Sequence, residues 1–574
     1  MRRVLRSGRR ASGATRAAAV LAVLALVTAA CGGDDDSGSD ATPATTAAPD
    51  TGTDTDTDTD TDTDTGDPDD DLDAGDAEAT TTTAAAEPEE QPEQGGEIVV
   101  ATLFEPFGLD VKTLVGNVFD GTVSNAIYSS LMVYDTNREV VPRLAESLES
   151  DDQQVWTLTL NPGIEFSDGT PFDADAVKFN LDRHADLEEN SRAYQNARNI
   201  SEVTVIDDTT LEIVLDFPWA AFPETLAGNL GKVGSPTAIQ ADPDGFNRNP
   251  VGAGAFVLEE WATGERIVLD RNPNYWVDGQ PYLDRIVVRA VPDTQTRIVS
   301  AEIGEIDIAQ SVNGAEIAEA PDRGLAGYPG EGPGITIWMN NSAPPFDDVR
   351  VRRAALMALD KRTIFDVVYG GAGQYPPNQF IISNDSEFSA RDQIDYPEYD
   401  PAAAAALIAE YEAENGPVSF TYACYGQSDL VNLAQIAQQM WAAAGIDVEI
   451  EIKDQLSVIL DVLTGNYSIS CFGATGQEDP DLAFYGQLHS DSATNYALYA
   501  NPAVDEALDA GRRTADFDER YEAYLVVQQA LADDVPFFQV VTSPWGWFGN
   551  PQIGGMAGLR DSTFDAAQLF LRSN

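Results

Sequence analysis

The sequence is poor in histidine, cysteine and basic residues, and each shortage argues against a class of function. Its two histidines, His184 and His489, are 305 positions apart, and no Gly-x-Ser-x-Gly motif is present. A Ser–His or Cys–His nucleophile, a metal cluster of the usual His/Cys spacing and a bound cofactor are therefore not indicated. Only 33 Lys and Arg stand against 96 Asp and Glu, a formal net charge of −63. Because so acidic a chain repels phosphate backbones, we expect no nucleic-acid partner.

Long apolar runs are also scarce, and the one at the N-terminus is short. Six arginines precede the apolar residues 17–30, which are too few to span a membrane and are followed directly by Cys31. This pattern predicts a signal peptide over residues 1–30 and export from the cytoplasm. The residues before the cysteine, LVTAAC at 26–31, resemble a bacterial lipobox, which implies lipidation of Cys31 and a place on the outer face of the cytoplasmic membrane or in the cell envelope. A plain secretory signal with an incidental cysteine is the alternative.

Residues 31–96 contain almost no apolar side chains. From residue 34 to residue 96 there are 22 acidic residues and no basic one, with a Thr-Asp repeat in the middle. Such a segment cannot offset the entropy of ordering and repels itself, so we expect a disordered acidic tether. A calcium loop is not indicated, because the glycine and terminal glutamate of such loops are missing from the repeat.

The rest of the chain has the patterns of a globular α/β protein, with too many residues for one hydrophobic core. Alternating apolar residues predict strands at 97–101 and 155–160 and a hairpin from 203–206 to 210–215, and Asp173 marks the start of a helix. Further on, strands at 418–423, 446–452 and 467–472 alternate with helices at 431–444 and 456–464. This order predicts a doubly wound unit in which the first and third strands are neighbours.

The only cysteines after Cys31 lie in this unit. Cys424 and Cys471 lie at the carboxyl ends of the two strands expected to be neighbours. In an oxidising compartment such a pair predicts a disulfide, and two separate buried thiols are the alternative. Ligands bind at the same edge of α/β sheets, which draws attention to Tyr425 and the loop after Cys471.

Several blocks of sequence resemble family 5 of the bacterial extracellular solute-binding proteins, the oligopeptide, dipeptide and nickel-binding group, over about residues 97–545. The most characteristic block is LNPGIEFSDGTPF at 160–172. The others follow in family order: YSSLMVYD at 128–135, VVPRLAES at 140–147, PVGAG at 250–254, LDRNPNYW at 269–276, GEIDI at 304–308, PFDDVRVRR at 345–353 and YANPAVD at 499–505.

The resemblance implies a two-lobed periplasmic-binding-protein clamshell of the class II type with an extra inserted domain. Lobe one would comprise residues 97–130, 249–332 and 531–574, the inserted domain residues 131–248, and lobe two residues 333–530. It further implies a monomeric receptor, not an enzyme, that passes a peptide or other small solute to the permease and ATPase subunits of an ABC importer. The rival functions are a ligand-presenting surface sensor with the same fold and a carboxylate-based hydrolase.

The expected ligand site combines aromatic walls with a few polar anchors between the lobes. The family's contact loop resembles residues 474–481, but Gly476 stands where peptide-binding members place an acid. A peptide, a sugar and a metal chelate therefore all remain possible ligands. The candidate ligand-binding residues are Trp338, Asn340, Tyr425, Gln427, Gln477, Glu478, Asp479 and Trp545.

The lipobox generates a prediction about Cys31. Replacing it, as in Cys31→Ala, removes the only acceptor for the lipid, so the exported protein should move from the membrane fraction to the soluble fraction. Cell fractionation and immunoblotting measure the change, with Cys424→Ala as the control that leaves the lipobox intact. A Cys31→Ala protein that stayed fully membrane-bound would contradict lipid anchoring.

Overall fold

The computed structural model describes residues 92–115, 120–136, 138–330, 332, 334–373, 375, 380, 382, 386–474, 479–542, 545–556, 559 and 563–572. Contacts divide the chain into two units, Met1–Glu90 and Gln91–Asn574, and all of these residues belong to the second unit. The predicted signal peptide, Cys31 and the tether up to residue 91 lie outside the described residues. Within the described part of the chain, no helix has the length and hydrophobicity needed to cross a bilayer.

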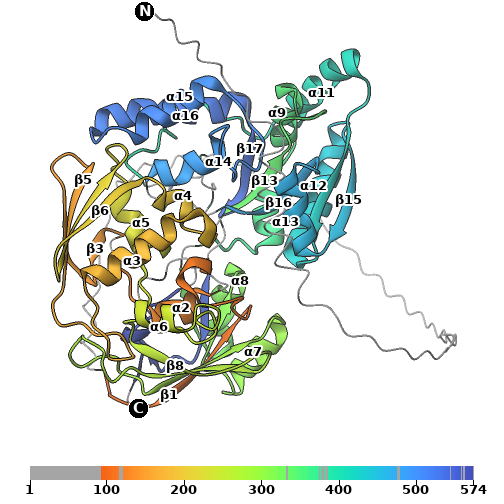
Figure 1. Cartoon of the computed structure of the whole chain (residues 1–574). Helices are drawn as coiled ribbons and strands as arrows, with labels where there is room; N and C mark the ends of the chain where they lie inside the picture. Colours follow the sequence, from red (N-terminus) through yellow and green to blue (C-terminus); the bar gives the residue numbers. More distant parts are fainter. Residues whose placement is uncertain are drawn as a thin grey trace, which may run out of the picture. The chain divides into compact units, whose positions relative to one another are not determined.

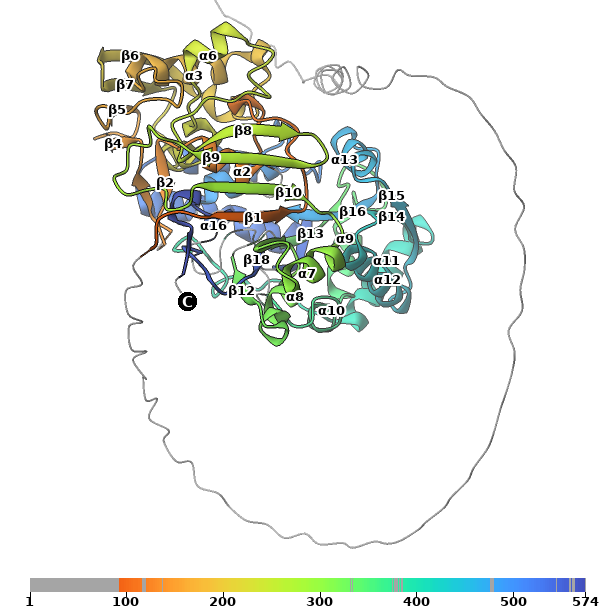
Figure 2. The ribbon, with the colours of Figure 1, turned by 90° about the horizontal axis from the view of Figure 1, so that it is seen from below.

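A seven-stranded mixed sheet forms the first layer, in the order β12-β18-β11-β1-β10-β9-β8. Its first strand, β1, is the β-branched segment predicted at 97–101, and it pairs in parallel with β10 and β11. Figure 2 shows β8, β9, β10 and β1 side by side. The strands are β1 (Glu97–Thr102), β8 (Phe256–Ala262), β9 (Arg266–Arg271), β10 (Arg285–Ala290), β11 (Ile308–Ser311), β12 (Ala326–Pro329) and β18 (Gly546–Gly549).

A five-stranded sheet contains the doubly wound unit, in the order β15-β14-β16-β13-β17 (Figure 1). β14 pairs in parallel with both β15 and β16, which confirms the predicted neighbours. The connecting helices also lie close to their predicted positions, as α12 (Ser428–Ala443) and α13 (Gln455–Thr464). The strands are β13 (Gly334–Met339), β14 (Ser419–Tyr425), β15 (Asp447–Lys453), β16 (Ile469–Ala474) and β17 (Phe537–Thr542).

A four-stranded antiparallel sheet, in the order β4-β5-β7-β6, lies in the segment predicted as the inserted domain. The predicted hairpin is confirmed by β6 and β7, and Asp173 caps α3 by accepting a hydrogen bond from the amide of Ala176. The buried side chains of this part form their own cluster, which includes Trp219 and Phe222. The elements are β4 (Ala145–Glu149), β5 (Val155–Leu160), β6 (Ile200–Asp207), β7 (Thr210–Leu215) and α3 (Ala174–Ala185).

The other elements are short strands and helices that connect or cover the three sheets. Small two-stranded sheets pair β2 (Met132–Tyr134) with β3 (Val140–Pro142) and β19 (Ile553–Gly554) with β20 (Phe570–Leu571). The helices are η1 (Val111–Thr113), α2 (Gly121–Ile127), η2 (Leu187–Glu189), α4 (Tyr194–Ala197), α5 (Phe222–Ala227), η3 (Asn229–Gly231), α6 (Pro236–Ala241), α7 (Thr294–Glu302), α8 (Gly314–Glu319), η4 (Ala320–Arg323), α9 (Val349–Met357), α10 (Lys361–Val368), α11 (Pro401–Asn415), the π-helical turn η5 (Asp481–Tyr485), α14 (Gly486–Leu488), α15 (Pro502–Arg512), α16 (Phe517–Asp534) and η6 (Ala566–Gln568).

The chain passes twice between the seven-stranded and five-stranded sheets, and the two passages are neighbours. β12 pairs with β18 at the end of the first sheet, and β13 pairs with β17 at the edge of the second. Between them, the amide of Gly330 donates to the carbonyl of Trp545 at 2.9 Å. The predicted end of lobe two at residue 530 is therefore wrong: β17 completes the five-stranded sheet, and the chain leaves that sheet only after Thr542.

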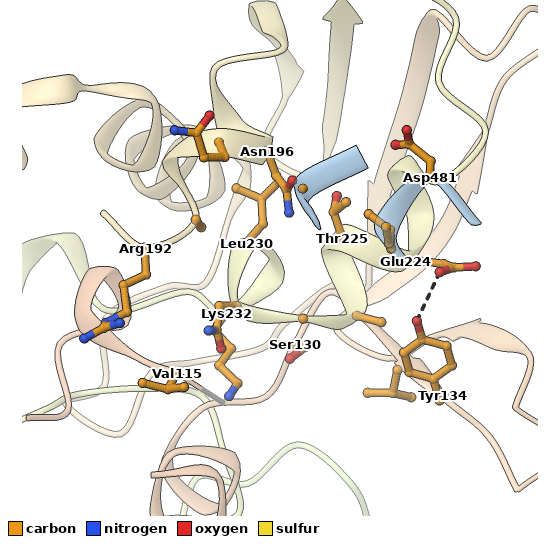
Figure 3. Close-up of a pocket in the computed structure, with 18 of the residues that line it drawn as sticks. Val115, Ser130, Tyr134, Arg192, Asn196, Glu224, Thr225, Leu230, Lys232 and Asp481 are labelled. Atoms are coloured by element: carbon orange, nitrogen blue, oxygen red, sulfur yellow. Dashed lines mark hydrogen bonds between the residues drawn. The ribbon is translucent and has the colours of Figure 1, made fainter. Parts of the chain in front are cut away.

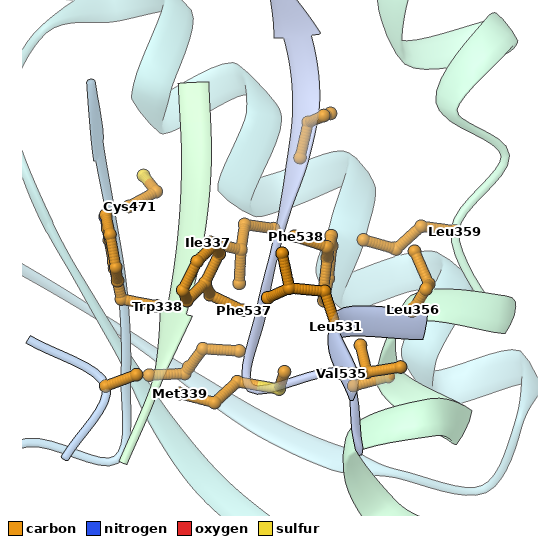
Figure 4. Packing of buried hydrophobic residues seen from close by; sticks show 14 of the residues in the cluster. Ile337, Trp338, Met339, Leu356, Leu359, Cys471, Leu531, Val535, Phe537 and Phe538 are labelled. Atoms are coloured by element: carbon orange, nitrogen blue, oxygen red, sulfur yellow. The ribbon is translucent and has the colours of Figure 1, made fainter. Parts of the chain in front are cut away.

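The five-stranded sheet is the centre of the largest apolar cluster. Figure 4 shows Ile337, Trp338 and Met339 of β13 packed with Phe537 and Phe538 of β17. Every residue of β13 is buried, because helices or neighbouring strands cover both faces. This continuous apolar strand, without polar alternation, is typical of the centre of an α/β sheet.

Cys424 and Cys471 are neighbours, but they are free, buried thiols, so the predicted disulfide is wrong. The parallel register that pairs Ala423 with Ser470 places the two cysteines side by side one residue later. Side chains at matched positions of parallel strands leave the sheet in the same direction and stay about 4.8 Å apart. A disulfide needs its Cβ atoms closer, at about 3.8 Å, and converging. Burial raises the pKa of both thiols and keeps them protonated.

The two free thiols predict how the protein reacts with an alkylating reagent. Iodoacetamide without reductant should leave Cys424 and Cys471 unmodified in the native protein, because both are fully buried. In urea, still without reductant, both should gain a carbamidomethyl group, as read by peptide mass spectrometry. The reduced and unfolded protein is the control, and modification that required reduction would indicate a disulfide.

Candidate functional site

A large cavity, with a volume of about 1530 Å³, is the candidate site (Figure 3). Three parts of the chain surround it: residues 115–232, which include much of the four-stranded-sheet region, residues 481–513 after β16, and residues 555–568 near the C-terminus. Ligand pockets commonly have volumes of about 300–1,000 Å³. The cavity therefore has room for a solute larger than a typical drug molecule.

The charge balance of the cavity differs from that of the chain. Its lining contains six Lys or Arg and seven Asp or Glu, whereas the whole chain has 33 and 96. Positive side chains are thus concentrated around this space. The six are Arg143, Arg192, Arg198, Lys232, Arg512 and Arg513.

A buried carboxylate joins two walls of the cavity. Asp481, at the start of η5, accepts a hydrogen bond from the indole of Trp219 at 2.8 Å and forms an ion pair with Arg512 at 3.0 Å. The Arg512 guanidinium also lies 3.5 Å from the centre of the Tyr485 ring. Trp219 belongs to the four-stranded-sheet region, whereas the other three residues follow β16. The contact therefore bridges two parts of the chain that are more than 250 residues apart.

Other ion pairs fix the remaining walls. Arg143 binds Asp565 at 3.1 Å and the hydroxyl of Tyr275 at 2.9 Å, which ties the loop after β3 to the C-terminal segment. Arg513 pairs with Asp509 at 3.3 Å on α15. Together with the Arg512–Asp481 pair, they neutralise half of the basic residues in the lining, and the Arg143–Asp565 pair joins two of the three surrounding segments.

A second polar cluster lies where β14 ends and α12 begins. Burial raises the pKa of Asp429 there, and burial also raises the pKa of Glu316 on α8, with the charge of Asp429 adding to the effect. Two carboxylates from different parts of the fold are therefore within electrostatic reach of each other. Perturbed carboxylates of this kind are common at functional sites, because a bound positive group restores their ordinary pKa.

Two of the predicted site residues belong to this cluster. Tyr425 is the last residue of β14; burial raises the pKa of its hydroxyl, and the charge of Asp429 adds to the effect. The side chain of Gln427 hydrogen-bonds to Asp429. The structure thus brings Tyr425 and Gln427 together with two acids that the sequence did not single out.

Trp338 and Asn340 lie inside the fold. Trp338 is 1% exposed and packs against Phe472, Tyr496 and Phe537, with ring centres 4.7–5.4 Å away. The amide of Asn340 donates to the carbonyls of Gly465 and Tyr467 at 3.0 Å each. These contacts give both residues a structural role, and neither lines the cavity.

The other predicted residues are dispersed. Asp479 is buried in an ion pair with Arg520 at 2.7 Å, which leaves this carboxylate little capacity for a ligand. Trp545 lies at the second passage between the sheets, half-buried, with its carbonyl bonded to Gly330. Gln477 and Glu478 lie outside the described residues.

Sequence reasoning missed Lys232, Arg192 and Asp481 in the cavity and Glu316 and Asp429 in the second cluster. One signal was available for the cations, since a basic residue is uncommon in this acidic chain and three of the six lie between residues 192 and 232. Nothing in the local pattern singles out the acids, because acidic residues are frequent throughout.

The comparisons with known proteins agree with this architecture. The family model for bacterial extracellular solute-binding proteins, family 5 (middle region), matches residues 139–496, more than half of the chain. The chain belongs to this family. As a family 5 protein it is extracytoplasmic, and the resemblance noted in the sequence blocks is confirmed.

Curated relatives of this family 5 protein are described as glutathione-binding. The protein GsiB of Pectobacterium atrosepticum is 28% identical over 459 residues, covering 77% of this chain and 88% of the relative. GsiB of Salmonella paratyphi A is 30% identical over 437 residues, covering 73% and 84%.

Solved structures show the fold. CtaP of Listeria monocytogenes, described as an ABC transporter substrate-binding protein, has a TM-score of 0.74 at 24% identity, covering 84% of this chain and all of CtaP. AppA of Bacillus subtilis, in complex with a nonapeptide, has a TM-score of 0.73 at 21% identity, covering 84% and 100%. AgaA of A. tumefaciens, in complex with agropinic acid, has a TM-score of 0.74 at 23% identity, covering 83% and 99%. The predicted two-lobed α/β clamshell is confirmed.

The Asp481 contact makes a prediction for stability. Asp481→Asn keeps the side-chain shape but leaves Arg512 buried without its counter-charge, and breaking a buried pair in this way costs about 3–5 kcal/mol. Urea denaturation measures the free energy of unfolding. Asp509→Asn is the matched control, because its partner Arg513 is 54% exposed and exposed pairs contribute about 0–1 kcal/mol. Equal losses of unfolding free energy in the two variants would show that the Asp481 contact contributes no more to stability than an exposed ion pair.

Proposed function

We propose that this protein is the lipid-anchored receptor of an ABC importer, which captures a peptide or a solute of similar size and delivers it to membrane permease and ATPase subunits. Membership of family 5 supports the receptor function. The observation that carries the proposal is the cavity of about 1530 Å³ surrounded by segments from the four-stranded-sheet region, from the chain after β16 and from the C-terminus.

Closure around solute follows from this arrangement. A solute that contacts two walls at once binds the closed form better than the open form, and it therefore shifts the population toward closure. The two neighbouring passages between the sheets are the positions where such a movement would bend the chain. The closed receptor would then dock on the permease.

The size of the ligand is suggested by the relatives, and its chemistry by the charges. Relatives are described as binding glutathione, a nonapeptide and agropinic acid. In this chain the position of the usual peptide-binding acid is Gly476. Glu316 and Asp429, which lie outside the cavity lining, could hold an ammonium group, because burial raises the pKa of both carboxylates and a bound ammonium would add a counter-charge.

Native mass spectrometry of the purified protein, followed by mild denaturation and identification of released molecules, tests the proposal. A co-purifying peptide or small solute is expected, at one molecule per chain. Glu316→Gln combined with Asp429→Asn should weaken binding of solutes that carry a free amino group. Substituting Glu302→Gln and Asp322→Asn, at exposed acids on α7 and η4, provides the control.

Two results would argue against the receptor proposal. Turnover of peptides or glycosides would favour a hydrolase, and a protein that bound nothing from a pooled library of peptides and solutes would argue against a solute receptor of this kind.

A further inference from the structure

Lys232 is a buried basic residue that faces the cavity. It directly follows η3, and its backbone forms an isolated antiparallel bridge with Ser130, which fixes its position. The residue is only 4% exposed, yet it belongs to the cavity lining. Figure 3 shows its side chain between Val115 and Ser130. Its ammonium group donates to the hydroxyl of Ser124 at 3.1 Å.

The described residues supply no ion-pair partner for this ammonium group. An ammonium has three hydrogens to donate, and the structure shows one hydrogen bond, to a neutral hydroxyl. Burial lowers the pKa of Lys232 to about 8, and the negative charge of Asp120 at the start of α2 opposes this shift only in part. A buried cation without a paired anion is costly. The site is therefore completed best by an anion from outside the chain.

The surroundings of Lys232 favour the same sign of ligand. Among the six basic residues in the lining, Arg143, Arg512 and Arg513 have carboxylate partners. Within the described part of the chain, Lys232, Arg192 and Arg198 form no ion pair. Three cations without a carboxylate partner around one cavity stand out in a chain with a net charge of −63, although the lining also contains seven Asp or Glu.

We infer that the cavity binds the carboxylate of an organic solute, with Lys232 as the buried anchor and Arg192 as a second, exposed cation of the same lining. This inference rests on the proposed receptor function and adds the chemical class of the solute. A carboxylate would supply the missing acceptors for the ammonium hydrogens and its missing counter-charge. Lys232 thereby selects acids over neutral solutes of the same size, which would leave the ammonium unpaired.

The anchor also links binding to pH. Lys232 is charged below its pKa, and a bound carboxylate raises that pKa further. Affinity for acids should therefore be constant below about pH 8 and fall as pH rises above 8. Tyr128, which also lines the cavity, remains neutral, because burial raises the pKa of its hydroxyl well above the ordinary value.

Matched pairs of acid and neutral probes test the anchor. Isothermal titration calorimetry of the purified protein would compare glutathione with its diethyl ester, and a pool of tripeptides to pentapeptides with the same peptides amidated at the C-terminus. Hydrogen bonds to charged groups contribute about 1.5–3 kcal/mol, so the acids should bind about 10-fold to 100-fold more tightly. Lys232→Met should abolish this difference and the fall in affinity above pH 8.

The control variant is Lys361→Met. Burial lowers the pKa of Lys361 on α10 to about 8 as well, but this lysine does not line the cavity. The Lys361→Met protein should keep the full preference for acids. Thermal unfolding of both variants checks that each is folded, and since Lys232→Met removes a buried charge, we expect its stability to be retained.

The outcomes separate this inference from the receptor proposal. Equal binding of acids and their neutral forms, or an undiminished preference in Lys232→Met, would overturn the anchor while leaving the receptor intact. Binding of inorganic phosphate, together with no binding of any carboxylate probe, would overturn the carboxylate assignment. Failure of every probe, acid or neutral, to bind would overturn both proposals.

Discussion

The fold depends on the chain crossing twice between its two large sheets at the same place. Because β12 pairs with β18 and β13 pairs with β17, the outgoing and returning segments are tied to each other on both sides of the crossing. Close packing enforces this arrangement: a side chain at Gly546 would place its Cβ 2.1 Å from the carbonyl oxygen of Tyr328. The two sheets are thus joined by neighbouring strands, so bending at this position would move one sheet relative to the other.

Charge pairing has two different uses in the molecule. Where the acid and base are both buried, as in Asp479 with Arg520 and Asp481 with Arg512, the pairs stabilise the segment between β16 and α16 against its neighbours. Where a buried charge has no ion-pair partner, as at Lys232, or where two buried acids lie within reach of each other, as Glu316 and Asp429 do, part of the electrostatic cost remains in the protein. Such groups mark the positions where a bound ligand lowers the free energy most, because the ligand supplies the missing counter-charge.

The sequence predicted the elements well and the site poorly, for one physical reason. Strand and helix positions follow from local periodicity, so β5 (Val155–Leu160) and the order β15-β14-β16 could be deduced. A side chain's surroundings depend on elements far away in the chain. Trp338 was predicted to face ligand, but β17 covers it, and β17 was itself assigned to the wrong lobe. The same holds for Lys232, whose burial depends on α2 more than a hundred residues earlier.

The cysteine pair shows the limit of topology as evidence: Cys424 and Cys471 lie on neighbouring strands, as predicted, but they do not form a disulfide.

The net charge of −63 has a consequence for the rate at which solute is captured. Around so negative a molecule the long-range field repels an anionic solute, although the cavity attracts it at short range. Salt screens the long-range repulsion beyond about 10 Å and acts less on buried groups. A receptor built in this way takes up an acidic solute faster in salty surroundings than in dilute ones, the reverse of ordinary electrostatic steering.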